Sequence, residues 1–136
     1  MPIPDAPPLP LAEVASRFDL THRTLRFWEY CELISPLPRE KGGPRRYAPD
    51  QVARVGRSVR LRRMRFPLSD ILDLLALEAA GGDGAPAATR LRMLKARSDA
   101  LAAEADEIAH ARRLVIEERH ALHGVEAPAD APAEPR

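Results

Sequence analysis

The feature that most constrains the fold is an apolar stripe along residues 88–123. With Leu91 taken as position a of a heptad, every d position is large and apolar: Leu94, Leu101, Ile108, Val115 and Leu122. The a positions are Leu91, Ser98, Ala105, Arg112 and Arg119, so the stripe becomes less apolar toward its C-terminal end. As one helix the segment would span about 54 Å.

A stripe of this length needs another surface to cover it, and the chain offers no globular body large enough. A second copy of the chain is the expected cover. The residues predicted to form the dimer contact are Leu91, Leu94, Leu101, Ala105, Ile108, Val115 and Leu122. The alternative is a single amphipathic helix that folds back on its own first half.

The charged residues beside the stripe favour an antiparallel pair. In a parallel pair Arg90 would face Lys95 of the other copy, whereas an antiparallel crossing near Glu104 pairs Arg90 with Glu118 twice. That crossing also brings Glu104 near its own copy. The preference is small, because each exposed ion pair contributes less than about 1 kcal/mol.

Two short helices are predicted near the N-terminus. "LAEVASRF" (11–18) carries apolar residues at helical spacing. A break at 19–21 follows, and Thr21 is a suitable N-cap for a second helix that contains "RTLRFWEY" (23–30). Two short helices joined by such a turn form a helix-turn-helix.

The second helix has two different faces. Leu25 and Trp28 are three residues apart and are expected to face the first helix. The outward row is Arg23, Arg26, Phe27 and Tyr30. This row favours a contact surface for a negatively charged partner, and the alternative is a solvated basic face with stray aromatics.

Residues 33–49 predict a basic wing. Four prolines exclude a helix here, and Gly42-Gly43 supplies a turn between two short extended arms. Four cations surround the turn: Arg39, Lys41, Arg45 and Arg46. Such a hairpin could reach a second stretch of phosphate backbone, while the alternative is an ordinary solvated loop.

Two further helices are predicted before a hinge. The first runs from Asp50, as its N-cap, to Met64, with outward arginines at 54, 57, 60, 62 and 63. The second occupies 66–77 and packs through Ile71, Leu72, Leu74 and Leu75. "GGDGAP" (81–86) then ends it.

These expectations together define a mainly α chain. An N-terminal winged helix-turn-helix domain with a small β wing precedes a long antiparallel coiled-coil dimerisation helix. The predicted parts are a disordered tail (1–8), the winged helix-turn-helix domain (9–80), a hinge (81–87), the coiled-coil helix (88–123) and a disordered tail (124–136).

Charge is distributed unevenly along the chain. Residues 1–70 carry 13 Lys/Arg and 8 Asp/Glu, a net +5, whereas residues 71–136 carry 8 and 12, a net −4. Nearly all the cations are arginine, whose planar group suits phosphate and guanine edges. We therefore expect the N-terminal half to bind a polyanion. No signal peptide or membrane-spanning run is evident, so a cytoplasmic, nucleoid-associated location is the expectation.

The order of parts resembles the MerR family of bacterial transcription regulators over about residues 9–123. The matching stretches are "LAEVASRFDLTHRTLRFWE", "GGPRRY" followed by "APDQVARV", and "RFPLSDILDLL", ahead of the long helix. The sequence lacks the paired sensor cysteines of the metal-sensing branch, and it looks most like regulators of metabolic genes. The resemblance implies a dimer that binds a near-palindromic operator in double-stranded DNA between widely set promoter elements.

The resemblance also implies a mechanism. Family members bend and undertwist the promoter spacer so that RNA polymerase engages both elements, which is indirect readout of DNA. By the family's pattern Arg23, Arg26 and Phe27 lie at the major groove, while Arg45 and Arg62 bind phosphates. Tyr47 matches the wing tyrosine of the family, which supports the wing or touches DNA.

The predicted DNA-binding residues come from the second helix, the wing and the third helix. They are Thr21, His22, Arg23, Arg26, Phe27, Tyr30, Arg39, Lys41, Arg45, Arg46, Tyr47 and Arg62. The chain departs from the family at Glu32 and Arg65, which replace common glycines, and at Pro44, which replaces a common wing tyrosine. Glycine loss there affects helix-ending turns, because positive φ costs other residues more.

Other residue patterns predict no chemistry. Cys31 is expected to be a small buried residue rather than a redox switch. Glu117, His120 and His123 could hold a metal, but solvent exposure is the stronger expectation. No nucleophile–base pair or phosphate loop is evident, so neither an enzyme nor a cofactor is expected.

Two other functions remain open from the sequence. The chain could be an architectural or chromosome-anchoring winged-helix protein without a promoter role, or a coiled-coil adaptor whose basic half binds acidic proteins. The sequence leaves open the operator, any effector, and activation versus repression.

Overall fold

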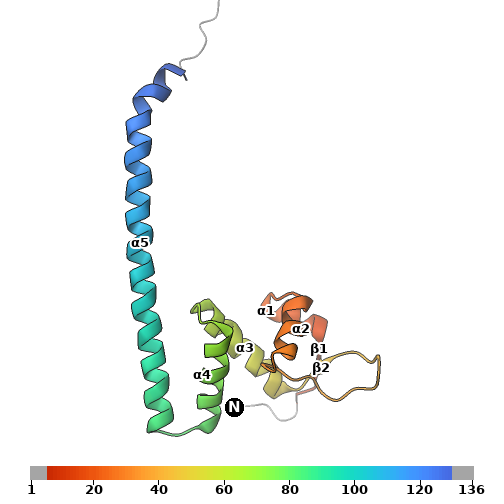
Figure 1. Ribbon diagram of the computed structural model, residues 1–136. Helices are drawn as coiled ribbons and strands as arrows, with labels where there is room; N and C mark the ends of the chain where they lie inside the picture. The colour runs from red at the N-terminus through yellow and green to blue at the C-terminus, as the bar shows by residue number, and fades with distance from the viewer. Residues whose placement is uncertain (1–5, 130–136) are drawn as a thin grey trace, which may run out of the picture. The chain divides into compact units, whose positions relative to one another are not determined.

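The structure is a computed structural model that describes residues 6–129, with side chains as far as His123. Figure 1 shows its elements, which are β1 (Leu9–Pro10), α1 (Leu11–Phe18), α2 (His22–Tyr30), β2 (Arg46–Tyr47), α3 (Pro49–Arg63), α4 (Leu68–Ala80) and α5 (Ala85–Ala129). Contacts divide the chain into two units between Arg90 and Leu91, and each unit is described by itself. The expected mainly α class with a small β wing is confirmed.

The helix-turn-helix forms as predicted. α1 ends at Phe18 and Asp19 is its C-cap, with a left-handed backbone (φ 54°); Leu20 N donates to the Ala15 carbonyl at 2.8 Å. The side-chain oxygen of Thr21 accepts a hydrogen bond from Thr24 N at 3.0 Å. This bond confirms Thr21 as the N-cap of α2, where it satisfies an amide that the helix itself leaves unpaired.

The strand pairing of the wing differs from the predicted hairpin. β2 pairs antiparallel with β1, with Leu9 opposite Tyr47 and Pro10 opposite Arg46. Across the wing itself, Leu37 N donates to the Arg46 carbonyl at 2.8 Å. Prolines limit a ladder between the two arms because they lack the amide that it needs, so the N-terminal segment supplies the partner strand.

α3 begins one residue earlier than predicted. Ala48 is the residue that precedes the helix, Pro49 is its first residue, and Asp50 lies inside the first turn rather than at the cap. Proline is compatible with the first helical position because no intrahelical partner awaits its missing N–H. The Asp50 carboxylate still interacts favourably with the positive end of the helix dipole.

Two arginines of α3 bond within the fold instead of pointing outward. The Nε of Arg54 donates to the Leu33 carbonyl. The Nε of Arg57 donates to Glu78 Oε1 of α4 at 2.9 Å. The prediction of outward side chains is therefore wrong for these two, because helical spacing does not show which neighbours will pair with a long side chain.

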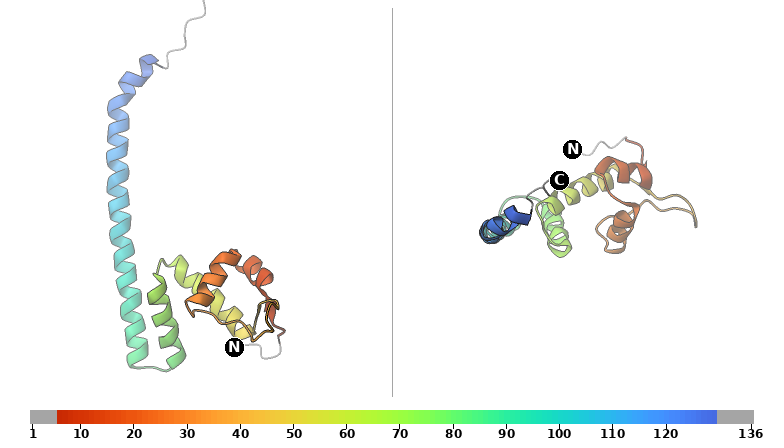
Figure 2. Two further views of the ribbon diagram at one scale, coloured as in Figure 1. Left: turned by 45° about the vertical axis from the view of Figure 1, so that its right-hand side comes forward. Right: turned by 90° about the horizontal axis from the view of Figure 1, so that it is seen from above.

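The core lies where α3 contacts α1 on one side and α4 on the other (Figure 2). Its fully buried or nearly buried side chains include Val14, Leu25, Trp28, Leu33, Ile34, Val55, Leu61, Phe66, Ile71, Leu74 and Leu75. α1 and α3 approach closely at Gly56, where an added Cβ would lie 3.0 Å from the Phe18 ring.

The two positions that lack the family's glycines keep the turns that glycine would favour. Glu32 has φ 61° and Arg65 has φ 66°. Leu33 N then donates to the Trp28 carbonyl at 2.9 Å. The helix-ending turns are preserved at both sites, at the conformational cost that side chains pay in the left-handed region.

The boundaries of α5 differ from those predicted for the coiled-coil segment. α5 includes 85–87, which had been predicted as hinge, and continues through 124–129, which had been predicted as tail. Ala88 N already donates to the Gly84 carbonyl at 2.9 Å, and Pro86 is tolerated because it lies in the first turn. The linker is therefore 81–84, where three glycines have positive φ.

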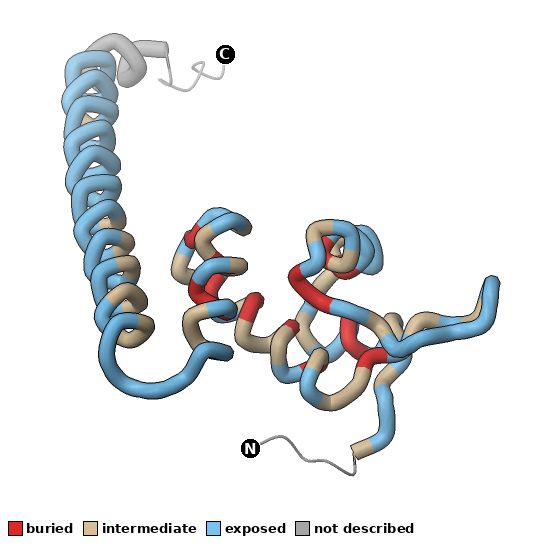
Figure 3. The backbone as a smooth tube through the Cα atoms, turned by 60° about the horizontal axis from the view of Figure 1, so that its bottom comes forward, coloured by how far each residue is buried: buried red, intermediate tan, exposed pale blue. Residues whose placement is uncertain are grey.

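The second unit contains most of α5, whose side chains are largely exposed (Figure 3). Leu91 and Ile108 are each 68% exposed, Val115 is 66% exposed and Leu122 is 59% exposed. None of the helices in the described part of the chain has the length and apolar character needed to cross a bilayer.

Candidate nucleic-acid interface

α2 separates core residues from a contact face. Leu25 is fully buried and Trp28 is 5% exposed, which confirms the predicted inward pair. On the other side Phe27 is 53% exposed and Tyr30 is 85% exposed. Large aromatic side chains exposed together on one short helix are typical of a binding surface.

Cations and polar groups adjoin these aromatics. His22, Arg23 and Arg26 are exposed along α2, and Arg26 Nε donates a long hydrogen bond to the His22 carbonyl at 3.4 Å. Thr21 is exposed too, but its hydroxyl oxygen caps the helix. The contact face of α2 therefore combines two arginines with two aromatic rings.

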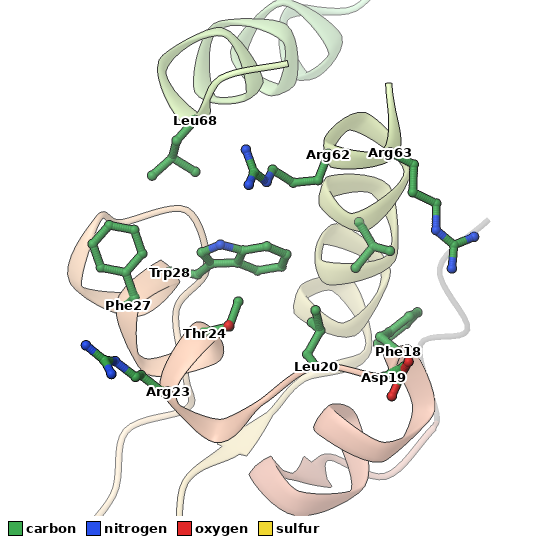
Figure 4. A pocket seen from close by; sticks show the side chains of 11 residues that line it. Phe18, Asp19, Leu20, Arg23, Thr24, Phe27, Trp28, Arg62, Arg63 and Leu68 are labelled. Carbon is green, nitrogen blue, oxygen red and sulfur yellow. The ribbon is translucent and has the colours of Figure 1, made fainter. Parts of the chain in front are cut away.

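A groove separates α2 from the corner between α3 and α4 (Figure 4). Arg23 and Phe27 line it from α2, and Arg62 lines it from α3. Figure 4 shows the Arg62 guanidinium extended into the space between Trp28 and Leu68. Two arginines that were predicted to bind DNA therefore border the same groove.

Arg63 lines this groove as well, although it was not among the predicted DNA-binding residues. Its side chain extends away from that of Arg62 in Figure 4. Arg60 and Arg63 both line a second groove beside α1. The run of arginines in α3 was the sequence signal for this extended basic surface.

The wing tip holds a turn surrounded by cations. Gly43 N donates to the Glu40 carbonyl at 2.8 Å, and Gly42 has φ 84°, a conformation that glycine adopts without strain. A terminal nitrogen of Arg39 donates to the Gly43 carbonyl at 2.7 Å. Arg39, Lys41 and Arg46 are all exposed, as a phosphate contact requires.

The base of the wing is bonded to the end of α2. Arg45 Nε donates to Glu29 Oε2 at 3.0 Å, and the Tyr47 hydroxyl donates to Glu29 Oε1. Arg45 keeps 30% of its side chain exposed, whereas Glu29 keeps only 12%. Burial, followed by the hydrogen bond and charge of Glu29, raises the pKa of Tyr47.

Tyr47 does not lie on the predicted DNA-binding surface. Its side chain is fully buried, so it supports the wing rather than presenting its ring to a partner. The sequence did not identify Glu29 as a functional residue, because the residues next to it do not show which distant side chains bond to its carboxylate. Both partners lie 16 and 18 residues further along the chain.

The family model described as "MerR HTH family regulatory protein" matches residues 9–78, just over half of the chain. The chain belongs to the MerR family. It is a DNA-binding transcription regulator with a helix-turn-helix, as the resemblance implied. No curated protein sequence matches it.

Solved structures of MerR-family proteins have similar folds. A transcriptional regulator from Bacillus cereus is 21% identical, with a TM-score of 0.74 over 96% of this chain and 88% of that one. HiNmlR, a regulator that lacks the sensor domain and is bound to promoter DNA, is 18% identical, with a TM-score of 0.66 over 89% and 94%. A regulator from Listeria monocytogenes is 22% identical, with a TM-score of 0.64 over 90% and 92%.

In this MerR-family chain the predicted dimer residues all lie on α5. Leu91, Leu94, Ile108, Val115 and Leu122 are exposed. Leu101 is half-buried and Ala105 is exposed. The apolar stripe predicted from the heptads is therefore present on a continuous helix.

The remaining candidates have ordinary surroundings. Among the described residues, no three His, Cys, Asp or Glu side chains come together as a metal site would need, and Glu117, His120 and His123 are exposed on α5. Cys31 is half-buried rather than fully buried, at the end of α2.

Proposed function

We propose that two copies of this chain pair through α5 as an antiparallel coiled coil and bind a near-palindromic operator in double-stranded DNA. The pair bends and undertwists the promoter spacer, so that RNA polymerase reaches both promoter elements through the distorted DNA. The protein acts in the cytoplasm on the nucleoid. The exposed apolar stripe of α5, joined in one chain to an arginine-rich helix-turn-helix, is the observation that carries this proposal.

The stripe supports pairing on energetic grounds. Leu91, Ile108 and Val115 each leave about two thirds of the side chain in water. Burying a large apolar side chain stabilises an assembly by about 1.5–3 kcal/mol. Several such side chains on each copy supply enough free energy to offset the cost of association.

The composition of the a positions supports the antiparallel direction. In a parallel pair each a residue faces its own copy, so Ser98 and Arg112 would each meet themselves in the seam. In an antiparallel pair each a residue faces a d residue of the other copy. Leu91 then faces Val115, and Ser98 faces Ile108.

The ion-pair argument for direction is weaker than the sequence suggested. Arg90 lies 3.6 Å from Glu78 of its own chain, so its charge is shared before any partner arrives. Arg97 lies 3.2 Å from Glu104 on the same helix. The direction therefore rests on the apolar layers more than on the flanking charges.

Disulfide cross-linking tests both pairing and direction. Leu91→Cys and Val115→Cys are made separately in a Cys31→Ala background, and the chains are oxidised singly and mixed. An antiparallel pair predicts a cross-linked dimer only in the mixture. Cross-linking of each variant with itself would indicate a parallel pair, and a monomer throughout would exclude the dimer.

DNA distortion is tested on a promoter that the protein activates. The proposed dimer carries two copies of α2, the proposed recognition helix, and bending and undertwisting the spacer would let both copies reach their half-sites. Shortening the spacer to the usual length should make transcription independent of the protein. If transcription from the shortened promoter still depended on the protein, the proposed mechanism would be contradicted. A binding assay on the same promoter shows that the protein still binds it, so that independence is not mistaken for lost DNA binding.

A further inference from the structure

Glu29 occupies an unexpected position for an acidic residue. It lies in the last turn of α2, on the helix that carries Arg23 and Arg26, in a protein whose partner is a polyanion. Its carboxylate is nevertheless nearly buried, and both of its oxygens accept hydrogen bonds from the wing. Both oxygens of this carboxylate therefore have hydrogen-bond partners, as a nearly buried polar group requires.

Glu29 makes the side-chain hydrogen bonds that join α2 to the wing. Among the described residues, the side-chain hydrogen bonds between α2 and the wing both end on Glu29, from Arg45 and from Tyr47. Side chains of α3 also bond to the start of the wing segment, where Gln51 Oε1 accepts from Ser35 N at 2.8 Å. At the base of the wing, Leu11 N donates to the Arg45 carbonyl at 3.1 Å. That bond joins the base of the wing to the start of α1, whereas the backbone bonds to α2 lie at the start of the wing segment, where Leu33 N donates to the Trp28 carbonyl at 2.9 Å.

We propose that Glu29 is a positioning residue that holds the wing in a fixed position against α2, so that both elements contact DNA as one preorganised surface. The inference rests on the proposed contact between the wing cations and phosphate. A wing already held in place loses less conformational freedom on binding, and this preorganisation strengthens affinity. The bond from Arg45 also holds that arginine beside the phosphate-binding face.

Two effects of Glu29 have opposite signs, which makes the inference testable. As a charge, the carboxylate repels phosphate, so removing it should strengthen DNA binding. As a lock, it keeps Arg45 and the neighbouring wing cations in register with α2, so removing it should weaken binding. The direction of the change in affinity therefore decides which effect dominates.

The test compares Glu29→Gln with Glu32→Gln in the full chain. Glu32 is exposed two residues beyond the end of α2, and no side-chain partner of Glu32 is found within the described part of the chain, so its substitution removes the same charge without removing a bond to the wing. The probe is a duplex selected from a random-sequence library by the wild-type chain. Binding is followed by fluorescence anisotropy over a range of salt concentrations.

We expect Glu29→Gln to weaken binding roughly tenfold. The slope of log K against log salt should fall by about 0.9 for each phosphate contact that the wing loses. Glu32→Gln should bind as tightly as the wild type or more tightly. The salt slope separates positioning from lost stability, because partial unfolding lowers the active fraction without changing the slope.

Tyr47→Phe provides a second test that leaves charge and shape almost unchanged. It removes one of the two bonds to Glu29, so we expect binding to weaken by about threefold, with a smaller fall in the salt slope. In an Arg45→Ala background Glu29→Gln should weaken binding by only about threefold, because the bond from Tyr47 is then the one that remains to be lost. Unchanged or tighter binding by both Glu29→Gln and Tyr47→Phe would overturn the inference. Failure of the wild-type chain to select any duplex would instead count against the proposed function.

Discussion

The winged-helix unit, from β1 to α4, and α5 differ in whether their apolar side chains are buried or exposed. In the winged-helix unit, Val14, Leu61 and Ile71 have no exposed surface, because helices distant in sequence cover them. In α5, Leu91, Ile108 and Val115 remain mostly exposed along a helix of 45 residues. A single helix gains no core from its own chain, whereas four short helices and a strand pair can cover one another.

This difference predicts two kinds of stability within one protein. Folding of the winged-helix unit should be independent of protein concentration, because its core is internal. Order along the apolar stripe of α5 should depend on concentration, because the covering surface is proposed to come from a second copy.

The largest expected effect compares a buried leucine with an exposed one. Leu61→Ala should lower the free energy of unfolding of the winged-helix unit by about 2–5 kcal/mol at any concentration, since it leaves a cavity. Leu91→Ala should leave that unit unchanged and weaken the dimer instead. Chemical denaturation and sedimentation at several concentrations measure the two effects. Equal destabilisation by both would show that α5 shares the core of its own chain.

A second comparison separates arginines by their place in the molecule. Arg26→Ala should weaken operator binding by about 1–3 kcal/mol, because Arg26 lies on the contact face of α2. Arg113→Ala removes the same charge from an exposed position on α5 and serves as the matched control. Anisotropy titrations of both variants measure the difference. Operator binding that is indifferent to Arg26 would remove α2 as the recognition helix.

The smallest effect concerns the two turns that lack glycine. Glu32→Gly and Arg65→Gly should each stabilise the winged-helix unit by up to about 1 kcal/mol, because glycine adopts positive φ without the clash of a Cβ. Ala102→Gly in α5 is the contrasting change, since glycine inside a helix is unfavourable. Thermal unfolding measures all three, and destabilisation by the first two would show that their side chains contribute contacts that offset the strain.

Local signals explain the parts of the fold that the sequence predicted well. Thr21 was identifiable as an N-cap because it precedes a helical pattern, and its bond to Thr24 spans only three residues. The inward pair Leu25 and Trp28 followed from helical spacing. By contrast, the loss of the family's glycines at Glu32 and Arg65 was expected to affect the helix-ending turns, yet both residues keep positive φ.

The errors concern partners distant in the sequence. β2 pairs with Leu9–Pro10 instead of with the other arm of the wing. Tyr47 is buried, which favours the wing-supporting role over the DNA contact that the sequence had left open beside it. Arg54 and Arg57 bond to groups 21 residues away. Residue spacing fixes which face of an element a side chain occupies, but it does not identify what lies opposite that face.

The sequence by itself determined the succession of helices, the turn between α1 and α2, the place of the wing and the apolar stripe of α5. Each depends on residues within a few positions of one another, so backbone propensity and periodicity are sufficient. The tertiary structure alone decided which arginines remain exposed and that Glu29 joins α2 to the wing. Hydrogen bonds and burial at those residues depend on segments that only the folded chain brings together.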